Sequence, residues 1–127
     1  MNAAIHHISI ICTERNLAFY RALGFKESFR KVRANDTIVL MDGCGIRLEF
    51  FVDPSHPSHK SGADEPVGLR HFALEFDDTI ENVINRLKSS FDESPEIGPI
   101  TEDWNGTRFC FIKDFDGIPV EFKESDK

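Results

Sequence analysis

Gly45-Ile46-Arg47-Leu48-Glu49-Phe50 and Gly117-Ile118-Pro119-Val120-Glu121-Phe122 are the stretches that decide the fold of this chain. They agree in four of six positions. Upstream of them, His7-Ile8-Ser9-Ile10 parallels His71-Phe72-Ala73-Leu74, because each is a histidine followed by a large apolar, a small and a second large apolar residue. A repeat with the same beginning and the same end predicts one structural module present twice.

Each half contains one expected helix after its histidine strand. Thr13 is a suitable N-cap for the first helix, and Gly24 is well placed to end it. Asp78 or Thr79 is the expected cap of the second helix. The apolar residues of this second helix recur at helical spacing: Ile80, Val83, Ile84 and Leu87.

Runs of β type follow each helix. We expect them at 26–33, 36–41 and 46–52 in the first half, and at 96–100, 107–112 and 118–123 in the second. Asp42-Gly43 and Asp116-Gly117 are turn signals before the last strand of each half. The sequence therefore predicts an α+β protein with two βαβββ modules, at about 4–52 and about 70–124, joined by a linker at about 53–69 within a single domain, 1–127.

The histidines and glutamates of the repeat share one strand phase. Successive strand side chains point to opposite faces, so His7 opposes the face of Ile8, and Glu49 opposes that of Leu48. The second half has the same phase. If each helix covers the apolar face, the other face of each curved sheet lines a concave surface. Two such surfaces facing one another would bring together His7, Glu49, His71 and Glu121.

These four side chains are the candidate metal ligands. Two neutral imidazoles and two carboxylates suit a borderline divalent ion and leave coordination positions for water or substrate. We expect one ion, with Zn or Ni favoured and Co, Mn or Fe as alternatives. A site with open positions is catalytic in type rather than structural.

Two neighbouring side chains leave alternatives open. His6 adjoins His7 and is an alternative ligand, but its strand phase groups it with Ile8, which favours His7. Glu75 shares a face with His71 and is a candidate ligand or base, although a solvated carboxylate is the interpretation we favour.

The linker also contains two histidines, His56 and His59, among prolines and serines. Flexible histidines of this kind are poorly preorganised for a metal. We interpret both as solvated loop residues.

Composition limits the partners and the compartment. A net charge of -7 argues against nucleic acid, and we interpret the basic cluster Arg30, Lys31 and Arg33 as a solvated strand face. No apolar run approaches the roughly 20 residues of a membrane helix, and the first residues lack the features of a signal peptide. We therefore expect a soluble cytoplasmic protein with a small-molecule substrate and no membrane partner.

The cysteines agree with that compartment. Cys12, Cys44 and Cys110 are odd in number and widely spaced among apolar residues. We expect reduced thiols that act as small core residues.

The residues resemble the vicinal oxygen chelate superfamily, which includes glyoxalase I, extradiol dioxygenases, fosfomycin-modifying enzymes and bleomycin-resistance proteins. The resemblance extends over about residues 4–123. It rests on residues 5–10, 18–25, 48–50, 68–73 and 114–121, which include His7, Glu49, His71 and Glu121. It implies two βαβββ modules that form a curved mixed sheet.

The resemblance also implies a reaction. Ring-cleaving and thiol-transferring members use two histidines and one glutamate, whereas glyoxalase I types have ligands at all four positions, as this chain does. A glyoxalase I-like lyase or isomerase would act on a small oxygen-chelating substrate, such as a thiol hemithioacetal of methylglyoxal. The resemblance assigns Glu121 as the base that removes a carbon-bound proton, with Glu49 assisting reprotonation.

Two departures and two alternatives accompany that prediction. Glutathione-dependent members carry an arginine and an asparagine where this chain has Ile11 and Asp53, which argues against glutathione. The alternatives are an iron-dependent extradiol-type dioxygenase and a metal-free protein that sequesters a small molecule. The resemblance further implies a homodimer with the metal site between chains.

Overall fold

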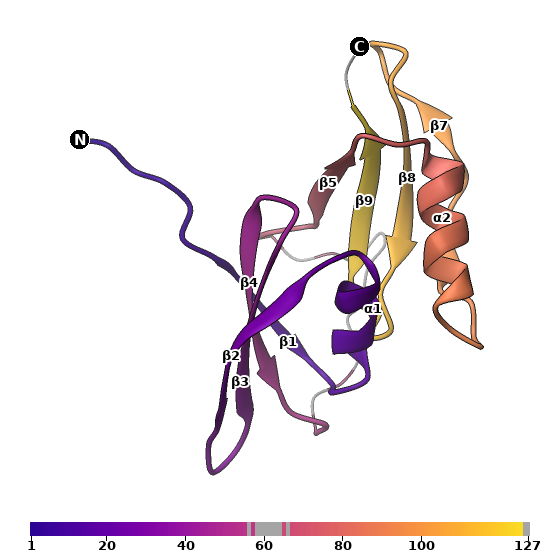
Figure 1. The fold of residues 1–127 in the computed structure, drawn as a ribbon. Helices are drawn as coiled ribbons and strands as arrows, with labels where there is room; N and C mark the ends of the chain where they lie inside the picture. Colours follow the sequence, from indigo (N-terminus) through magenta and orange to yellow (C-terminus); the bar gives the residue numbers. More distant parts are fainter. Residues whose placement is uncertain (56, 58–64, 66, 126–127) are drawn as a thin grey trace. The chain divides into compact units, whose positions relative to one another are not determined.

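The computed structural model describes residues 1–55, 57, 65 and 67–125, which form parts of two compact units, Met1–Pro57 and Ser58–Lys127 (Figure 1). Each unit has its own β-sheet, with strands that run both parallel and antiparallel to their neighbours. The α+β class predicted from the repeat and the mixed strand directions implied by the resemblance are confirmed. None of the helices in the described part of the chain is long and apolar enough to cross a membrane.

Unit 1 is built on a four-stranded sheet with the strand order β1-β4-β3-β2. Its elements are β1 (Ile8–Cys12), α1 (Asn16–Ala22), β2 (Lys26–Val32), β3 (Thr37–Gly43) and β4 (Ile46–Val52). Strands β1 and β4 run parallel and place Ser9 beside Glu49, whereas β4 pairs with β3 in the antiparallel direction.

The core of unit 1 lies on one face of this sheet. The ring of Tyr20 from α1 lies 5.1 Å from that of Phe50 in β4 and 6.0 Å from that of Phe25. The other buried apolar residues of this core include Ile10, Leu17, Phe19, Val39, Met41 and Leu48. Because α1 packs on this face, Ser9 and Glu49 lie on the opposite one, as the strand phase predicts.

Unit 2 contains the second sheet, in which β5 is followed by β9, β8 and β6, while β7 also pairs with β8. Its elements are β5 (Phe72–Phe76), α2 (Ile80–Ser89), β6 (Glu96–Ile97), β7 (Thr101–Glu102), β8 (Arg108–Lys113) and β9 (Pro119–Glu124). Strands β5 and β9 run parallel and place Ala73 beside Glu121, which repeats the pairing of Ser9 with Glu49. Helix α2 packs against β8 and β9 (Figure 1).

The helix predicted in unit 2 from its cap and its apolar spacing is confirmed as α2. Thr79 is its N-cap, and the hydroxyl of this residue accepts a hydrogen bond from the backbone N–H of Asn82 at 3.2 Å. The four apolar residues at helical spacing are all buried: Ile80, Val83, Ile84 and Leu87. Capping and an apolar stripe together are sufficient local signals for a helix of this length.

The start of α1 differs from the prediction. The helix begins at Asn16 and its N-cap is Arg15, whose side chain does not cap the helix, so the assignment of Thr13 as the cap was wrong. The Thr13 carbonyl instead accepts a hydrogen bond from the Asn16 N–H at 3.1 Å, which makes this segment a turn before the helix. Gly24 follows the helix with a positive φ of 102°, and its assignment as the stop is confirmed.

The turn between β3 and β4 also lies elsewhere than predicted. Strand β3 continues through Asp42 and Gly43, and the turn is made by Cys44 and Gly45, whose φ angles are 51° and 76°. Gly43 is needed for a close approach instead, since a Cβ there would lie 2.8 Å from the Phe25 backbone. In unit 2 the Asp116-Gly117 turn is confirmed by a φ of 87° at Gly117. Of the run expected at 96–100, only Glu96–Ile97 forms a strand, β6, and β7 follows it at Thr101–Glu102.

Two of the three cysteines occupy the positions expected of them. Cys12 and Cys110 are buried, and burial raises the pKa of the Cys110 thiol to about 11. Cys44 is exposed in the β3–β4 turn, so its assignment to the core was wrong. The tight turn requires a positive φ at this position, which keeps the side chain away from the core face.

The basic cluster lies on an exposed part of β2 and the turn after it. Arg30 forms an ion pair with Glu27, and Arg33 forms one with Asp36 through two hydrogen bonds of 2.7 Å. Both arginines therefore have acidic partners, as expected of a solvated strand face.

Candidate metal centre

The first candidate ligand pair lies at the start of β1. His7 directly precedes this strand, and its Nε2 atom lies 3.4 Å from Oε1 of Glu49 in β4. The parallel β1–β4 ladder produces this proximity, because the residue after His7 pairs with the residue before Glu49. Both side chains are partly exposed, at 34% for His7 and 21% for Glu49.

The second pair repeats the first in unit 2. His71 directly precedes β5, and its Nε2 atom lies 3.1 Å from Oε1 of Glu121 in β9. Here the exposed fractions are lower, at 22% for His71 and 18% for Glu121. In both units the histidine comes just before the first strand rather than within it.

The donor atoms of each pair fit a shared divalent ion. Bonds of about 2.0–2.2 Å to one nitrogen and one oxygen, opening at about 90–110°, separate the two ligand atoms by roughly 2.8–3.6 Å. The separations of 3.4 Å and 3.1 Å lie within this interval. Across residues 1–55, 57, 65 and 67–125, no three or more His, Cys, Asp or Glu side chains form a metal-binding group. Each unit thus has one His/Glu pair whose spacing suits an ion.

The outer nitrogens of the two imidazoles have different partners. Nδ1 of His7 lies 2.8 Å from Nδ1 of His6, a ring that donates or accepts according to its tautomer. Nδ1 of His71 lies 3.1 Å from Nη1 of Arg70, and a guanidinium only donates. Neutral His71 therefore accepts at Nδ1 and carries its proton on Nε2, where it donates to Glu121. Metal binding at Nε2 requires this proton and the Arg70 contact to be displaced.

The two carboxylates also have different neighbours. Oε1 of Glu49 accepts a hydrogen bond from the Ser9 hydroxyl at 2.9 Å. The residue in the same ladder position beside Glu121 is Ala73, which has no hydroxyl. On the other side Glu121 pairs with Phe111 of β8, and the Phe111 ring lies edge-on to His71 with their centroids 4.8 Å apart.

The next positions along each strand differ in character as well. In unit 1, Ile11 pairs with Phe51 on the face that carries Glu49, and the Arg33 guanidinium lies 5.5 Å from the Phe51 ring centroid. In unit 2 the corresponding positions are occupied by Glu75 and Lys123. Lys123 donates to Asp103 at 2.8 Å and holds the pKa of that carboxyl below its usual range. The strand positions that follow Glu49 and its ladder partner are therefore apolar, with Arg33 above them, whereas those that follow Glu121 and its partner are charged.

A buried aspartate fixes the turn that leads to Glu121. Oδ1 of Asp114 accepts hydrogen bonds from the backbone N–H groups of Asp116, at 3.0 Å, and Ile118, at 2.9 Å. Asp114 is only 5% exposed. The start of β9 is thereby held by a side chain whose role the turn signal alone did not identify.

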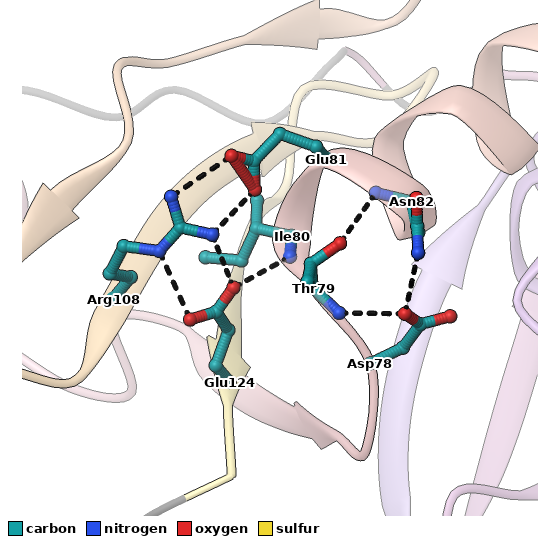
Figure 2. Close-up of polar contacts among 7 residues, drawn as sticks. All are labelled: Asp78, Thr79, Ile80, Glu81, Asn82, Arg108 and Glu124. Atoms are coloured by element: carbon teal, nitrogen blue, oxygen red, sulfur yellow. Dashed lines mark hydrogen bonds and ion pairs between the residues drawn. The ribbon is translucent and has the colours of Figure 1, made fainter.

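The end of β9 is held by an ion-pair cluster that ties three elements together (Figure 2). Arg108 of β8 donates to Glu124 of β9 at 2.6 Å and to Glu81 of α2 at 2.6 Å. Glu124 also accepts the backbone N–H of Ile80 at 2.9 Å and so satisfies a free donor of the first turn of α2. Hydrogen bonding from Arg108 holds the pKa of Glu81 below its usual range.

The remaining histidines and Glu75 were the other candidates predicted from the sequence. His6 contacts His7, but it is His7 whose Nε2 faces Glu49. Glu75 is exposed in β5, two residues beyond Ala73 on the Glu121 face. His56 and His59 lie outside the described residues. Sequence reasoning missed Ser9 and Arg70. The role of Ser9 is recognisable only once the β1–β4 pairing is known, whereas Arg70 is adjacent to His71 in the sequence.

Known proteins of similar sequence and fold identify the family of this chain. A family model described as the glyoxalase/bleomycin resistance protein/dioxygenase superfamily matches residues 4–122. The uncharacterized protein YwkD of Bacillus subtilis is 33% identical over 95% of this chain and 96% of its own length. A glyoxalase family protein from Enterococcus faecalis has 31% identity and a TM-score of 0.81, covering 95% of this chain and 97% of that one.

A lactoylglutathione lyase from Agrobacterium tumefaciens has the same fold, with a TM-score of 0.63 and 23% identity over 98% of this chain and 95% of that one. This chain belongs to the glyoxalase/bleomycin resistance protein/dioxygenase superfamily, also called the vicinal oxygen chelate superfamily. Its members include enzymes and commonly bind a divalent metal ion.

Proposed function

We propose that this protein is a metal-dependent lyase or isomerase of the glyoxalase I type, with one divalent ion held by His7, Glu49, His71 and Glu121. The supporting observation is that each unit places an imidazole Nε2 and a carboxylate Oε1 at a separation that suits a shared ion. The lactoylglutathione lyase among the proteins of the same fold supports the reaction type.

The proposed reaction moves one proton between adjacent carbons. Glu121 takes the carbon-bound proton of a hemithioacetal, and the proton returns to the neighbouring carbon, so that a hydroxy thioester forms without any net gain or loss of atoms. A bound divalent ion supplies electrostatic stabilisation of the negative charge that develops on the substrate oxygens. Glu121 is the less exposed of the two glutamates and lies beside Ala73 and Phe111, which offer no side-chain hydrogen-bond donors. Glu49 is the second carboxylate ligand of the proposed site.

The substrate class follows from the surroundings of the ligands. We propose a small compound that chelates through adjacent oxygens, such as a thiol hemithioacetal of methylglyoxal. Ile11 is 56% exposed and offers no charge to a carboxylate. The Asp53 carboxylate accepts the backbone N–H of Ser55 at 2.9 Å and repels anions near the end of β4. Both features disfavour glutathione as the thiol.

We also propose that the protein acts as a homodimer.

The test joins metal analysis to a reaction screen. Protein purified without chelators is expected to contain about one divalent ion per chain, because four ligands of this type bind first-row ions tightly. Elemental analysis that finds no stoichiometric ion, even after reconstitution with Zn, Ni, Co, Mn or Fe, would overturn the proposal. Methylglyoxal is then offered with several thiols, and thioester formation is measured against chelator-treated protein. Oxygen consumption with catechols would instead indicate a dioxygenase.

A further inference from the structure

We propose that Ser9 is a positioning residue that fixes Glu49 as a permanent metal ligand, whereas Ala73, its counterpart in unit 2, leaves Glu121 free to act on the substrate. This inference rests on the proposed metal site. It is carried by the hydrogen bond of 2.9 Å from the Ser9 hydroxyl to Oε1 of Glu49.

The backbone holds Ser9 in place for this contact. Ser9 and Glu49 are direct partners in the parallel β1–β4 ladder, so their side chains leave the same face of the sheet next to one another. A serine hydroxyl has one proton to donate, and here it is directed to one carboxylate oxygen. Donation to Oε1 restricts rotation of the Glu49 carboxylate. A second lone pair on this oxygen, which also faces Nε2 of His7, stays available for an ion.

Hydrogen bonds of this kind tune metal ligands. A partner that bonds a ligating carboxylate orients it, and its loss typically reduces metal affinity about 10–100-fold. A carboxylate that is held in this way is also less able to turn away from the ion and take up a proton. Ser9 therefore assigns Glu49 to binding rather than to proton transfer.

Unit 2 has the same ladder but no hydroxyl at the corresponding place. Ala73 pairs with Glu121, and Phe111 pairs with Glu121 on the other side. Among the described residues, the polar side-chain partner recorded for Glu121 is His71, at 3.1 Å. The Glu121 carboxylate can therefore rotate about its side chain without breaking a hydroxyl hydrogen bond, as a group that alternates between ion and substrate must do.

The test measures metal affinity for the full chain and three variants: S9A, S9T and A73S. Dissociation constants for Zn²⁺ are obtained by competition with a chromogenic chelator, and the visible spectrum of the Co²⁺-loaded protein reports the coordination sphere. We expect S9A to weaken Zn²⁺ binding by about tenfold and to alter the Co²⁺ spectrum. S9T retains the hydroxyl and should restore both. A73S should tighten Zn²⁺ binding and slow turnover.

The outcomes separate this inference from the proposed function. If the wild-type chain binds no ion, both fall. If it binds Zn²⁺ and S9A has an unchanged dissociation constant and Co²⁺ spectrum, the role of Ser9 is wrong and the metal site stands. Weakening in S9A without rescue by S9T would show that packing rather than the hydroxyl is responsible, and would also overturn the role. Circular dichroism of each variant verifies the fold, and Ser9 is exposed, so alanine is tolerated there.

Discussion

The two His/Glu pairs of this protein have the same geometry and different surroundings. In unit 1 the carboxylate is held by the Ser9 hydroxyl and the imidazole contacts a second histidine. In unit 2 the carboxylate lies between Ala73 and Phe111, and the imidazole accepts from Arg70. The repeat therefore has the same His/Glu pair in both units but different neighbours around it. Under the proposed function, this difference would give the two pairs unequal parts in one reaction.

The largest expected difference is between the two glutamates. Glu121→Gln should lower kcat by about a hundredfold to ten-thousandfold, because a general base contributes that much and an amide cannot accept the proton. Glu49→Gln should act mainly on metal affinity, so that excess Zn²⁺ restores part of the turnover. The two variants are compared by kcat under metal saturation. Equal losses of kcat at saturation would show that the pairs are not differentiated.

The next comparison is between adjacent histidines. His7→Ala should weaken metal binding more than the roughly 10–100-fold effect of losing an outer partner, since it removes a ligand. His6→Ala is the matched control. It removes only the neighbouring ring, whose Nδ1 lies 2.8 Å from Nδ1 of His7. Its effect should stay within that smaller range. Chelator competition measures both, and a larger loss for His6→Ala would make His6 the ligand.

Much of this arrangement is readable from the sequence because it depends on local patterns. The strand phase places both glutamates opposite the buried residues Leu48 and Val120, and the spacing of α2 predicts its buried stripe. Those predictions need only the periodicities of strand and helix.

The contacts that distinguish the pairs are not readable in this way. Ser9 and Glu49 are 40 residues apart, and only the parallel β1–β4 register brings them together. The predicted Thr13 cap was wrong because the N-cap is Arg15, which caps the helix without a side-chain hydrogen bond to it. The predicted β3–β4 turn was wrong because the positive φ that makes the turn occurs at Cys44, a residue type that does not signal a turn. Non-local pairing and turn geometry are tertiary properties, and residue type specifies them weakly.

Arg70 provides a smaller test of the same comparison. Arg70→Gln should tighten metal binding several-fold, because it removes the donor that holds Nδ1 of His71 in the acceptor state. Arg33→Gln is the matched control. Each arginine lies over a phenylalanine ring and pairs with an acid, which is Glu65 for Arg70 and Asp36 for Arg33. The side-chain hydrogen bonds of Arg33 go to Asp36 rather than to an imidazole. Chelator competition for Zn²⁺ distinguishes them. Weaker binding in Arg70→Gln would contradict the expected tautomer of His71.

The smallest expected effect concerns the ion-pair clusters of the two units. Arg108 joins α2, β8 and β9, whereas Arg30 in β2 bonds its near neighbour Glu27 and also Glu14. Arg108→Gln should therefore lower the thermal midpoint by a few degrees at neutral pH. Arg30→Gln should lower it by less, because the bond of Arg30 beyond its own strand, to Glu14, is the longer one at 3.4 Å, and exposed pairs stabilise little.

The pH dependence of this difference follows from Glu81. Its pKa lies below the ordinary value of 4.5, chiefly because of the Arg108 hydrogen bond, so the folded state binds fewer protons than the unfolded chain in this range. The stabilisation is complete above that value and is lost as the pH falls through the lowered pKa. Thermal midpoints of wild type and Arg108→Gln should therefore converge in acid. A difference that persists or grows below that range would show that Arg108 stabilises unit 2 through packing of its alkyl chain rather than through its charge.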